Sequence, residues 1–267
     1  ANSNIPNSSD LTIKTRRNDS FDSTVETLYF KGSKQRREYS HDKPSTMNFV
    51  SISRCDERKR IILNEDARLY AELPLVDWSE QRKRARPIPL SETSGAEVTI
   101  TIDSIDTGER RPQGSYTARH VKIRTTVESG PGAAMPSSTE ERDGWYIDLP
   151  GAGCEDSGQR NGFVYAMLIA GGRRDRLHFK RQGNAHAGFP LEETTTRTEQ
   201  GKSTVSKVEL LEFSDSPLDD SLFQVPKGYS PAWSTPHGGY DMTKPETLTN
   251  RVRVYWAELR DWTKQWF

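Results

Sequence analysis

The sequence predicts a mainly β protein built from long antiparallel strands, with few helices. Apolar and polar residues alternate with a period of two over much of the 267-residue chain, which is the pattern of strands with one buried and one solvated face. Turn-forming clusters such as CDER and NEDA separate the alternating segments. Helix-forming signals occur only near the C-terminus, and a chain of this length can bury one sizeable core.

The predicted strands follow one another through the first half of the chain. They are DLTIKT, STVETLYF, KQRREY, MNFVSIS, KRIIL, RLYAEL, EVTITI and YTARHVKIRTTV. The basic run in LYFKGSKQRREY follows a turn at Gly32, so it lies on the returning strand of a hairpin. A solvated sheet face explains this run without any ligand.

The strands EVTITI and YTARHVKIRTTV show the clearest alternation. One face carries the aliphatic residues Val98, Ile100, Ile102, Val121, Ile123 and Val127. The other face carries Thr99, Thr101, Lys122 and Arg124. Because side chains alternate strictly across a strand, we expect the six aliphatic residues to share one buried or cavity-facing side of the sheet.

Three segments interrupt this pattern. Residues 77–95 are charged and contain prolines, and residues 128–144 are rich in Gly, Pro and Ser. The first is expected to contain one helical turn or none, and the second is predicted to be a long flexible loop. The run NGFVYAMLIAGG is apolar on both faces, which fits a buried central strand or a short buried helix, and its composition favours the strand.

Two helices are predicted near the C-terminus. SPLDDSLF places Ser216 at an N-cap and Pro217 at the first helical position. A second helix begins at Pro245 and carries one apolar stripe. The stripe consists of Leu248, Val252, Tyr255, Leu259, Trp262 and Trp266. Such a helix packs on its own sheet or docks on a partner, and its mixed polar face argues against a membrane surface.

The composition and the missing motifs limit the functional classes. Lys plus Arg and Asp plus Glu both total 38, so the formal net charge is zero, whereas nucleic-acid-binding proteins are usually basic. No apolar run approaches the ~20 residues of a membrane-spanning helix. The chain contains no nucleophile elbow, phosphate-binding loop, dinucleotide fingerprint or zinc-protease motif, and its five histidines are scattered. We therefore expect no enzyme activity, no cofactor, no metal, no nucleic-acid partner and no membrane-spanning segment.

The chain begins at Ala1 and continues into the polar sequence NSNIPNSSD. We expect residues 1–10 to form a flexible tail. A start of this kind remains after removal of a signal peptide, and trimming or another form of processing explains it equally well. The first explanation predicts an extracytoplasmic protein, either periplasmic or secreted.

Several segments, in this order, resemble bacterial envelope proteins of the LolA-like superfamily, including its poorly characterised secreted branches. They are YFKGSKQRREY, ISRCDERKRIILNEDARLYAEL, DTGERRPQGSYTARHV, DGWYIDLP, GFPLEETTT and SLFQVPKGY. The resemblance runs from about Leu11 to Tyr229. It implies that residues 11–230 form an antiparallel sheet curled into a half-barrel around an apolar concave face. Residues 231–267 then form a linker and the C-terminal amphipathic helix.

The resemblance also implies a function, because relatives carry or sense lipoproteins or lipids in the half-barrel cavity. No motif here matches the residues that define lipoprotein transfer. We expect a non-enzymatic extracytoplasmic protein that binds a lipid or another apolar ligand. The alternative is a structural or interaction subunit of a bacterial envelope complex, which docks through its aromatic C-terminal helix. A third and weaker class is an enzyme that uses its long loops as lids.

The two cysteines, Cys55 and Cys154, each lie in a predicted turn beside acidic residues. They fit one disulfide in an oxidising compartment, or two inert thiols in the cytosol. For the oxidised protein we predict a Cys55–Cys154 disulfide, which would stabilise the fold by ~2–5 kcal/mol because it closes a long loop.

Alkylation of the denatured, non-reduced protein followed by intact-mass measurement checks this disulfide. No alkylated thiol is expected before reduction and two after it. The double substitution Cys55→Ser and Cys154→Ser should lower the free energy of unfolding by the amount given above. Two alkylated thiols without reductant would contradict the prediction.

Overall fold

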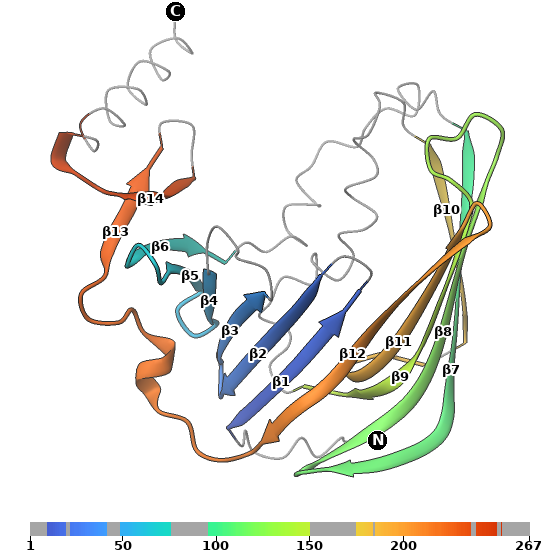
Figure 1. Ribbon diagram of the computed structural model, residues 1–267, viewed down its shortest axis with the longest axis horizontal. Coiled ribbons are helices and arrows are strands. Elements are labelled where there is room, and N and C mark those ends of the chain that lie inside the picture. Colours follow the sequence, from blue (N-terminus) through green and yellow to red (C-terminus); the bar gives the residue numbers. More distant parts are fainter. Residues whose placement is uncertain are drawn as a thin grey trace, which may run out of the picture.

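The computed structural model describes residues 10–19, 22–41, 49–75, 96–149, 175–183, 185–235, 239–249 and 252. These residues form one large, curled and unclosed β-sheet with very little helix, as Figure 1 shows. The mainly β prediction is therefore confirmed. No helix among the described residues is long and apolar enough to cross a membrane.

The first seven strands in the chain are β1 (Leu11–Asn18), β2 (Ser23–Lys31), β3 (Lys34–His41), β4 (Phe49–Arg54), β5 (Lys59–Asn64), β6 (Leu69–Pro74) and β7 (Glu97–Gln113). The remaining strands are β8 (Tyr116–Ser129), β9 (Ser138–Ile147), β10 (Arg176–Gly183), β11 (Phe189–Glu199), β12 (Lys202–Ser214), β13 (Ser230–Ser234) and β14 (Tyr240–Pro245). A single 3₁₀ turn, η3 (Asp220–Phe223), lies between β12 and β13.

The strand order across the sheet is β10-β7-β8-β9-β11-β12-β1-β2-β3-β4-β5-β6-β13-β14. Neighbouring strands are antiparallel except for β10 with β7 and β13 with β6, which are parallel. Strand β12 pairs with β11 over its first half and with β1 over its second half. It therefore joins strands from the two ends of the chain into one sheet.

The buried apolar residues do not all lie on one face of this sheet. Directly opposed residues of antiparallel strands share a face, and the register links Leu28 to Arg37 and Arg37 to Ser51. Leu28 and Ser51 therefore point to the same side, so Val50 and Ile52, which alternate with Ser51 along β4, point to the other. The apolar face changes side between β2 and β4.

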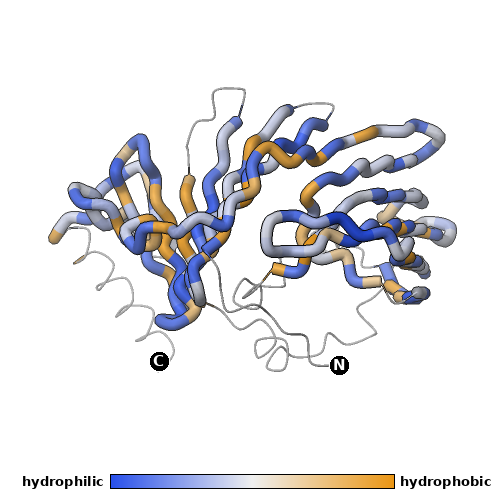
Figure 2. The backbone as a smooth tube through the Cα atoms, turned by 90° about the horizontal axis from the view of Figure 1, so that it is seen from below, coloured by the Kyte–Doolittle hydropathy of each residue, from blue (hydrophilic) through white to orange (hydrophobic). Residues whose placement is uncertain are grey.

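The largest core cluster brings β1 and β2 against the ends of strands from the other arm of the sheet. It contains Leu11, Ile13, Leu28, Phe30, Ala118, Ile147, Phe189 and Leu191. All eight are less than a tenth exposed. Figure 2 shows that orange apolar stretches are interspersed with hydrophilic ones along the strands. The curl of the sheet, rather than a layer of helices, covers this part of the apolar surface.

The second core cluster lies on the other face of β4 and β5, under the chain that follows β12. Its buried members are Val50, Ile52, Ile61, Leu63 and Phe223. Phe223 belongs to η3 and is fully buried. The turn is also tied to β3, because Arg36 donates a hydrogen bond to the carbonyl oxygen of Leu222 at 3.1 Å.

The helix predicted from Ser216 and Pro217 is wrong in extent. Only the four residues of η3 are helical, and their N-cap is Asp219, whose carboxylate accepts a hydrogen bond from the backbone N–H of Ser221 at 2.7 Å. An isolated helix this short has little stability of its own. Packing of Phe223 into the sheet therefore decides where the helical turn lies.

The prediction of one long loop over residues 128–144 is also wrong. Strand β8 continues to Ser129 and β9 begins at Ser138, so only residues 130–137 connect them. The opposed pairs in this part of the hairpin are polar, for example Thr126 with Thr139 and Arg124 with Glu141. A strand between two neighbours is held by backbone hydrogen bonds and cross-strand pairs, so it forms without apolar alternation.

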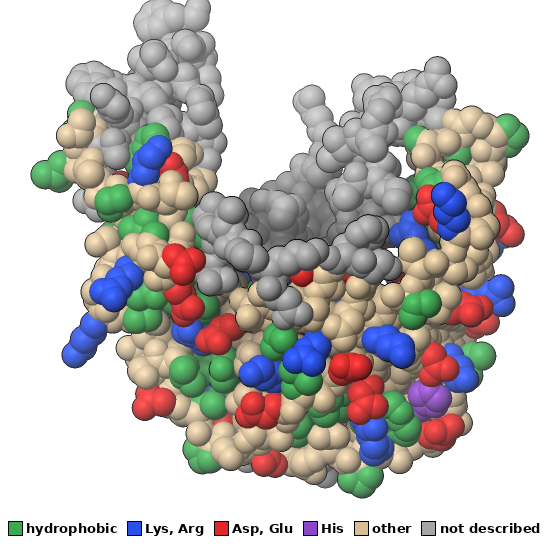
Figure 3. All heavy atoms as spheres, in the orientation of Figure 1, with side chains coloured by type: hydrophobic (Ala, Val, Ile, Leu, Met, Phe, Trp, Pro, Cys, Tyr) green, Lys and Arg blue, Asp and Glu red, His purple; other side chains and the backbone are tan. Residues whose placement is uncertain are grey.

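The basic run after Gly32 lies on β3, as the sequence indicated, and its cations are paired. Lys34 lies 3.0 Å from Asp220 and Arg37 lies 3.0 Å from Glu26. Figure 3 shows acidic and basic side chains interspersed over the face that it displays. Mixed charge of this kind suits a solvated sheet face.

Residues 231–267, predicted to form a linker and a helix, carry two further strands, β13 and β14. Pro245 ends β14 instead of opening a helix. Of the predicted apolar stripe, Leu248 and Val252 are helical and are 81% and 54% exposed. Tyr255, Leu259, Trp262 and Trp266 lie outside the described residues, as do segments 1–9, 76–95 and 161–172. Nothing in the structure therefore tests the predictions for those segments.

Substitution Phe223→Ala tests whether η3 covers the second apolar face. Because Phe223 is fully buried against β4 and β5, we expect the free energy of unfolding to fall by ~3–5 kcal/mol, as for other buried phenylalanines. Denaturant unfolding measures the change. Leu211→Ala is the control, because Leu211 is 41% exposed and should cost less than about 0.5 kcal/mol. Similar effects of both substitutions would contradict the role of η3.

A hollow beside strands β7 to β11

The candidate functional site is a hollow of about 620 Å³ bounded by β7, β8, β9, β10 and β11 and by residues 185–187. In Figure 1 these strands lie side by side in one arm of the sheet. The apolar residues that line it are Ile100, Ile102, Ile123, Val127, Phe179, Ala185 and Ala187. The charged residues that line it are Glu140, Arg142, Arg181 and Arg197.

The floor of the hollow follows from the strand register. Ile100 is opposed to Val127 on β8, and Ser104 is opposed to Ile123. The six aliphatic residues singled out in the sequence therefore share one face of β7 and β8, with Thr99, Thr101, Lys122 and Arg124 on the other. Four of the six line the hollow, whereas Val98 and Val121 lie beneath the surface and are fully buried.

Strand β10 forms one side of the hollow. Its parallel pairing with β7 places Phe179 beside Ile100 and Arg181 beside Ile102. The residue before β10, Asp175, is buried and accepts hydrogen bonds at 2.9 Å from the backbone N–H groups of Ala134 and Met135. This carboxylate fixes the start of β10 to the turn that joins β8 and β9. The side of the hollow that β10 forms is therefore anchored at one end.

Strands β9 and β11 form the opposite, charged side. Arg142 is opposed to Ile123 and Glu140 to Thr125 on β8, and Arg197 of β11 is opposed to Glu140. A buried polar pair, Tyr146 and Glu193, lies next to this side. The Tyr146 hydroxyl donates a hydrogen bond to Glu193 at 2.6 Å. Burial and the neighbouring Glu193 carboxylate raise the pKa of the Tyr146 phenol far above its ordinary value. Tyr146 therefore stays a neutral hydrogen-bond donor.

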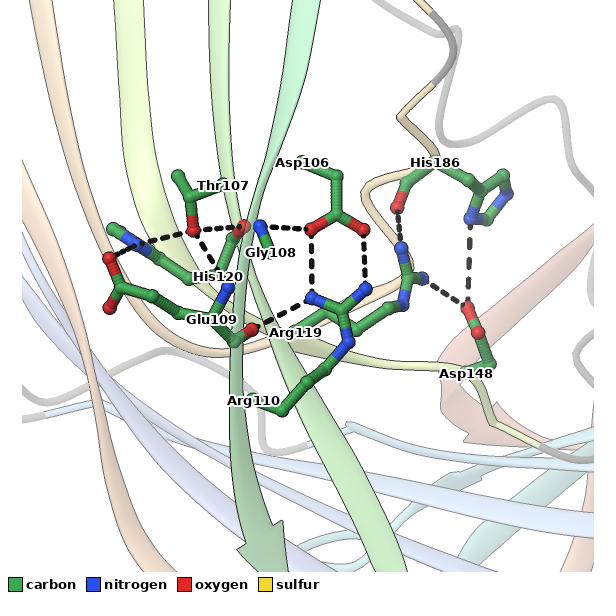
Figure 4. Close-up of polar contacts among 9 residues, drawn as sticks. All are labelled: Asp106, Thr107, Gly108, Glu109, Arg110, Arg119, His120, Asp148 and His186. Carbon is green, nitrogen blue, oxygen red and sulfur yellow. Dashed lines mark hydrogen bonds and ion pairs between the residues drawn. The ribbon is translucent and has the colours of Figure 1, made fainter.

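Residues 185–187 form a wall of the hollow, and Arg119 holds this wall in place. Arg119 donates hydrogen bonds to the carbonyl oxygen of His186 at 2.9 Å and to Asp148 at 2.7 Å, as Figure 4 shows. Ala185 and Ala187 pack against the cluster of Val121, Ile123 and Tyr146. One partly buried guanidinium group thus connects β8, the end of β9 and the wall.

A second polar group in Figure 4 lies at an irregularity of β7. The register with β8 shifts between Asp106 and Arg110, and Gly108 has a φ of +86° that favours glycine. Arg110 donates two hydrogen bonds to Asp106, at 2.8 and 2.9 Å. The hydrogen bonds from Arg110 and from the backbone of Gly108 lower the pKa of Asp106 below its ordinary range. The charged pair stabilises the bulge.

His120 has the surroundings of a catalytic base, but its contacts are structural. Its Nε2 lies 2.5 Å from Asp143 and its Nδ1 lies 3.2 Å from the Thr107 hydroxyl, and its ring stacks on Trp145. The Thr107 hydroxyl donates its proton to the carbonyl oxygen of His120, at 3.2 Å. The contacts of His120 with Thr107 on β7 and Asp143 on β9 thus tie β8 to both of its neighbours.

The Asp143 carboxylate beside His120 is kept ionised. Burial opposes ionisation, but hydrogen bonds from His120 and Lys122 outweigh this effect and lower the pKa of Asp143. Among the described residues, no group of three or more His, Cys, Asp or Glu side chains is arranged to hold a metal ion. The polar residues therefore position β7, β8 and β9 and leave the hollow as the candidate site.

Cys55 lies in the turn after β4 and is not a free thiol. Cys154 lies outside the described residues, so the Cys55–Cys154 disulfide stays a prediction.

Comparison with known proteins identifies no family for this chain, because no protein-family model and no curated protein matches it. The LolA-like resemblance therefore stays a prediction from the sequence motifs.

Sequence reasoning missed the residues that complete the hollow around its floor. Phe179, Arg181 and the wall segment were not selected, because the parallel strand β10 is short and almost wholly exposed. Arg142 and Arg197 lie in polar stretches of their strands, which resemble any solvated surface. The β-branched residues in TTTR favour a strand, but only the register reveals that Arg197 lies across from Glu140.

Substitution Arg119→Met tests the role of Arg119 in holding the wall. The change removes hydrogen bonds from a charged group, each worth about 1.5–3 kcal/mol, so amide exchange over residues 185–190 should accelerate by at least roughly tenfold. Hydrogen-exchange mass spectrometry measures this. Arg110→Met is the matched control, since Arg110 binds Asp106 and donates no hydrogen bond to residues 185–187. Equal acceleration in both variants would contradict the assignment.

Proposed function

We propose that this protein is a non-enzymatic binding protein that holds a lipid or another apolar molecule in the hollow beside β7 to β11. The observation that carries the proposal is the floor, where Ile100, Ile102, Ile123 and Val127 line an open space of about 620 Å³ together with Phe179. Small-molecule sites in proteins span about 300–1,000 Å³ and are lined mainly by apolar side chains.

The energetics of such a site suit an acyl chain. Each methylene removed from water contributes about 0.8 kcal/mol, so ten methylenes contribute about 8 kcal/mol before the costs of immobilisation are subtracted. A dissociation constant near 1 μM corresponds to a similar free energy. An apolar ligand therefore needs few polar contacts to bind here.

The LolA-like resemblance supports the same proposal, and with it a half-barrel architecture and an extracytoplasmic location. The curled, unclosed sheet is compatible with a half-barrel. A disulfide between Cys55 and Cys154 would fit an oxidising compartment. The absence of catalysis is part of the proposal, and the structural use of Thr107, His120 and Asp143 supports it.

A second candidate function is docking to a bacterial envelope partner through the C-terminal helix. The observation that favours it is the exposure of Leu248 and Val252, which are 81% and 54% accessible although both are aliphatic. Truncation after Thr247, which leaves β14 complete, should then abolish a complex seen by native mass spectrometry while leaving the melting temperature unchanged. In the ligand-binding proposal the same truncation leaves ligand binding at the hollow intact.

Binding of the neutral fluorescent probe N-phenylnaphthylamine tests the leading proposal. Phe179 is 49% exposed and lines the hollow, so Phe179→Ser should weaken binding at least about fivefold, the equivalent of roughly 1 kcal/mol of lost apolar contact. The melting temperature should change little. Leu211→Ser is the control, because Leu211 is similarly exposed and does not line the hollow.

Two results would count against the proposal. One is an absence of saturable probe binding by the wild-type protein. The other is an equal loss of binding in the Phe179→Ser and Leu211→Ser variants, which would place the bound probe outside the hollow.

A further inference from the structure

We infer that the hollow selects amphiphiles with an anionic head group, which Arg142 and Arg181 bind at opposite sides of the apolar floor. This inference rests on the proposed function and specifies the chemical class of its ligand. The head group is a carboxylate or a phosphate, and the attached chain is aliphatic.

The positions of the two arginines follow from the strand register. Arg181 on β10 lies beside Ile102 on β7, and Arg142 on β9 lies opposite Ile123 on β8. The apolar floor therefore lies between two guanidinium groups on the same face of the sheet. A chain lying on this floor brings its head group to one side or the other.

Both guanidinium groups have donors to spare. No ion pair or hydrogen bond of the Arg181 side chain occurs within the described part of the chain. Arg142 makes two long ion pairs, from Nε to Glu140 at 3.7 Å and from Nη1 to Glu193 at 3.8 Å, and neither carboxylate is within hydrogen-bond distance. Arg197, in contrast, is engaged by Glu199 at 2.9 Å. Spare N–H groups of a guanidinium are the donors that an anion would take.

The side chains that line the hollow carry a net positive charge, which is complementary to an anionic head group. Three arginines and one glutamate line the hollow, and its other polar residues are uncharged or are histidine. An arginine keeps its charge at all physiological pH values. An anionic head group can pair with either guanidinium group through two parallel, charge-assisted hydrogen bonds. An uncharged hydroxyl head group accepts only a weaker hydrogen bond, and a cationic head group is repelled.

Isothermal titration calorimetry with matched twelve-carbon ligands tests the inference. Dodecanoate and dodecyl phosphate should each bind at least about tenfold more tightly than dodecanol, a difference of about 1.4 kcal/mol. Comparison of the affinities for dodecanoate and dodecyl phosphate shows whether the site prefers a carboxylate or a phosphate head group. The preference should shrink when the ionic strength rises from about 0.05 M to about 0.5 M, because salt screens exposed charges.

The double substitution Arg142→Gln and Arg181→Gln should reduce the preference for anions to about twofold or less, with dodecanol binding unchanged. Arg176→Gln is the matched control, since Arg176 lies on the same strand, pairs with Glu97 and does not line the hollow. Thermal unfolding checks that each variant is folded. If the double variant is destabilised, Arg181→Gln alone serves, because Arg181 lies on the exposed edge strand.

Each other outcome is decisive. Equal binding of dodecanoate and dodecanol by the wild-type protein would overturn the anion preference and leave the proposed function intact. Absence of binding by all three ligands would overturn the proposed function itself. A tenfold preference that survives in the double variant would show that Arg142 and Arg181 do not select the head group.

Discussion

The sheet of this protein has to bury apolar side chains on two different faces, and the described residues provide almost no helix to cover them. Leu28 and Ile13 point to one side of the sheet, and Ile52 and Val50 point to the other. The reason is that the residue of β4 aligned with Leu28 through the strand register is polar, whereas its apolar neighbours face the opposite side. A sheet can cover one face by curling onto itself, and here the ends of β8, β9 and β11 meet β1 and β2. The other face needs a separate cover, which η3 supplies through Phe223.

The hollow follows from the limits of that curl. The large core cluster uses residues of β1, β2, β8, β9 and β11, whereas the apolar face of β7 and the adjoining part of β8 lies near the edge of the sheet. There β10 and residues 185–187 border the apolar residues instead of covering them all. An apolar surface of this kind favours binding of an apolar ligand, because removing the surface from contact with water lowers the free energy.

Polar groups at this edge serve two purposes. Asp175, Arg119 and the Asp106–Arg110 pair make hydrogen bonds that fix strands and turns. Arg142 and Arg181 differ from them, because Arg142 makes only ion pairs that are too long for hydrogen bonds and Arg181 pairs with no described residue. The first group explains why the hollow keeps its shape, and the second explains the chemical class of ligand that we infer for it.

The local sequence determined the strands with apolar alternation and the face that their side chains share. Val98, Ile100 and Ile102 lie on one side of β7 because side chains alternate on any extended chain, whatever the fold. The polar strand β9 and most of the charged lining could not be predicted, because their residues are compatible with any solvated surface. The predicted helix at Ser216 failed for a related reason, since the contact of Phe223 with β4 and β5 outweighs the capping signal.

Only the tertiary structure decided the strand order, and with it the site. Strand β10 lies beside β7 although more than sixty residues separate them in the chain, and β12 lies beside β1. Such pairings depend on backbone hydrogen bonds that every residue except proline can make, so side-chain type specifies them weakly. The sequence by itself therefore determined which residues are apolar and which face they share, whereas the pairing of distant strands decided that arginines flank them.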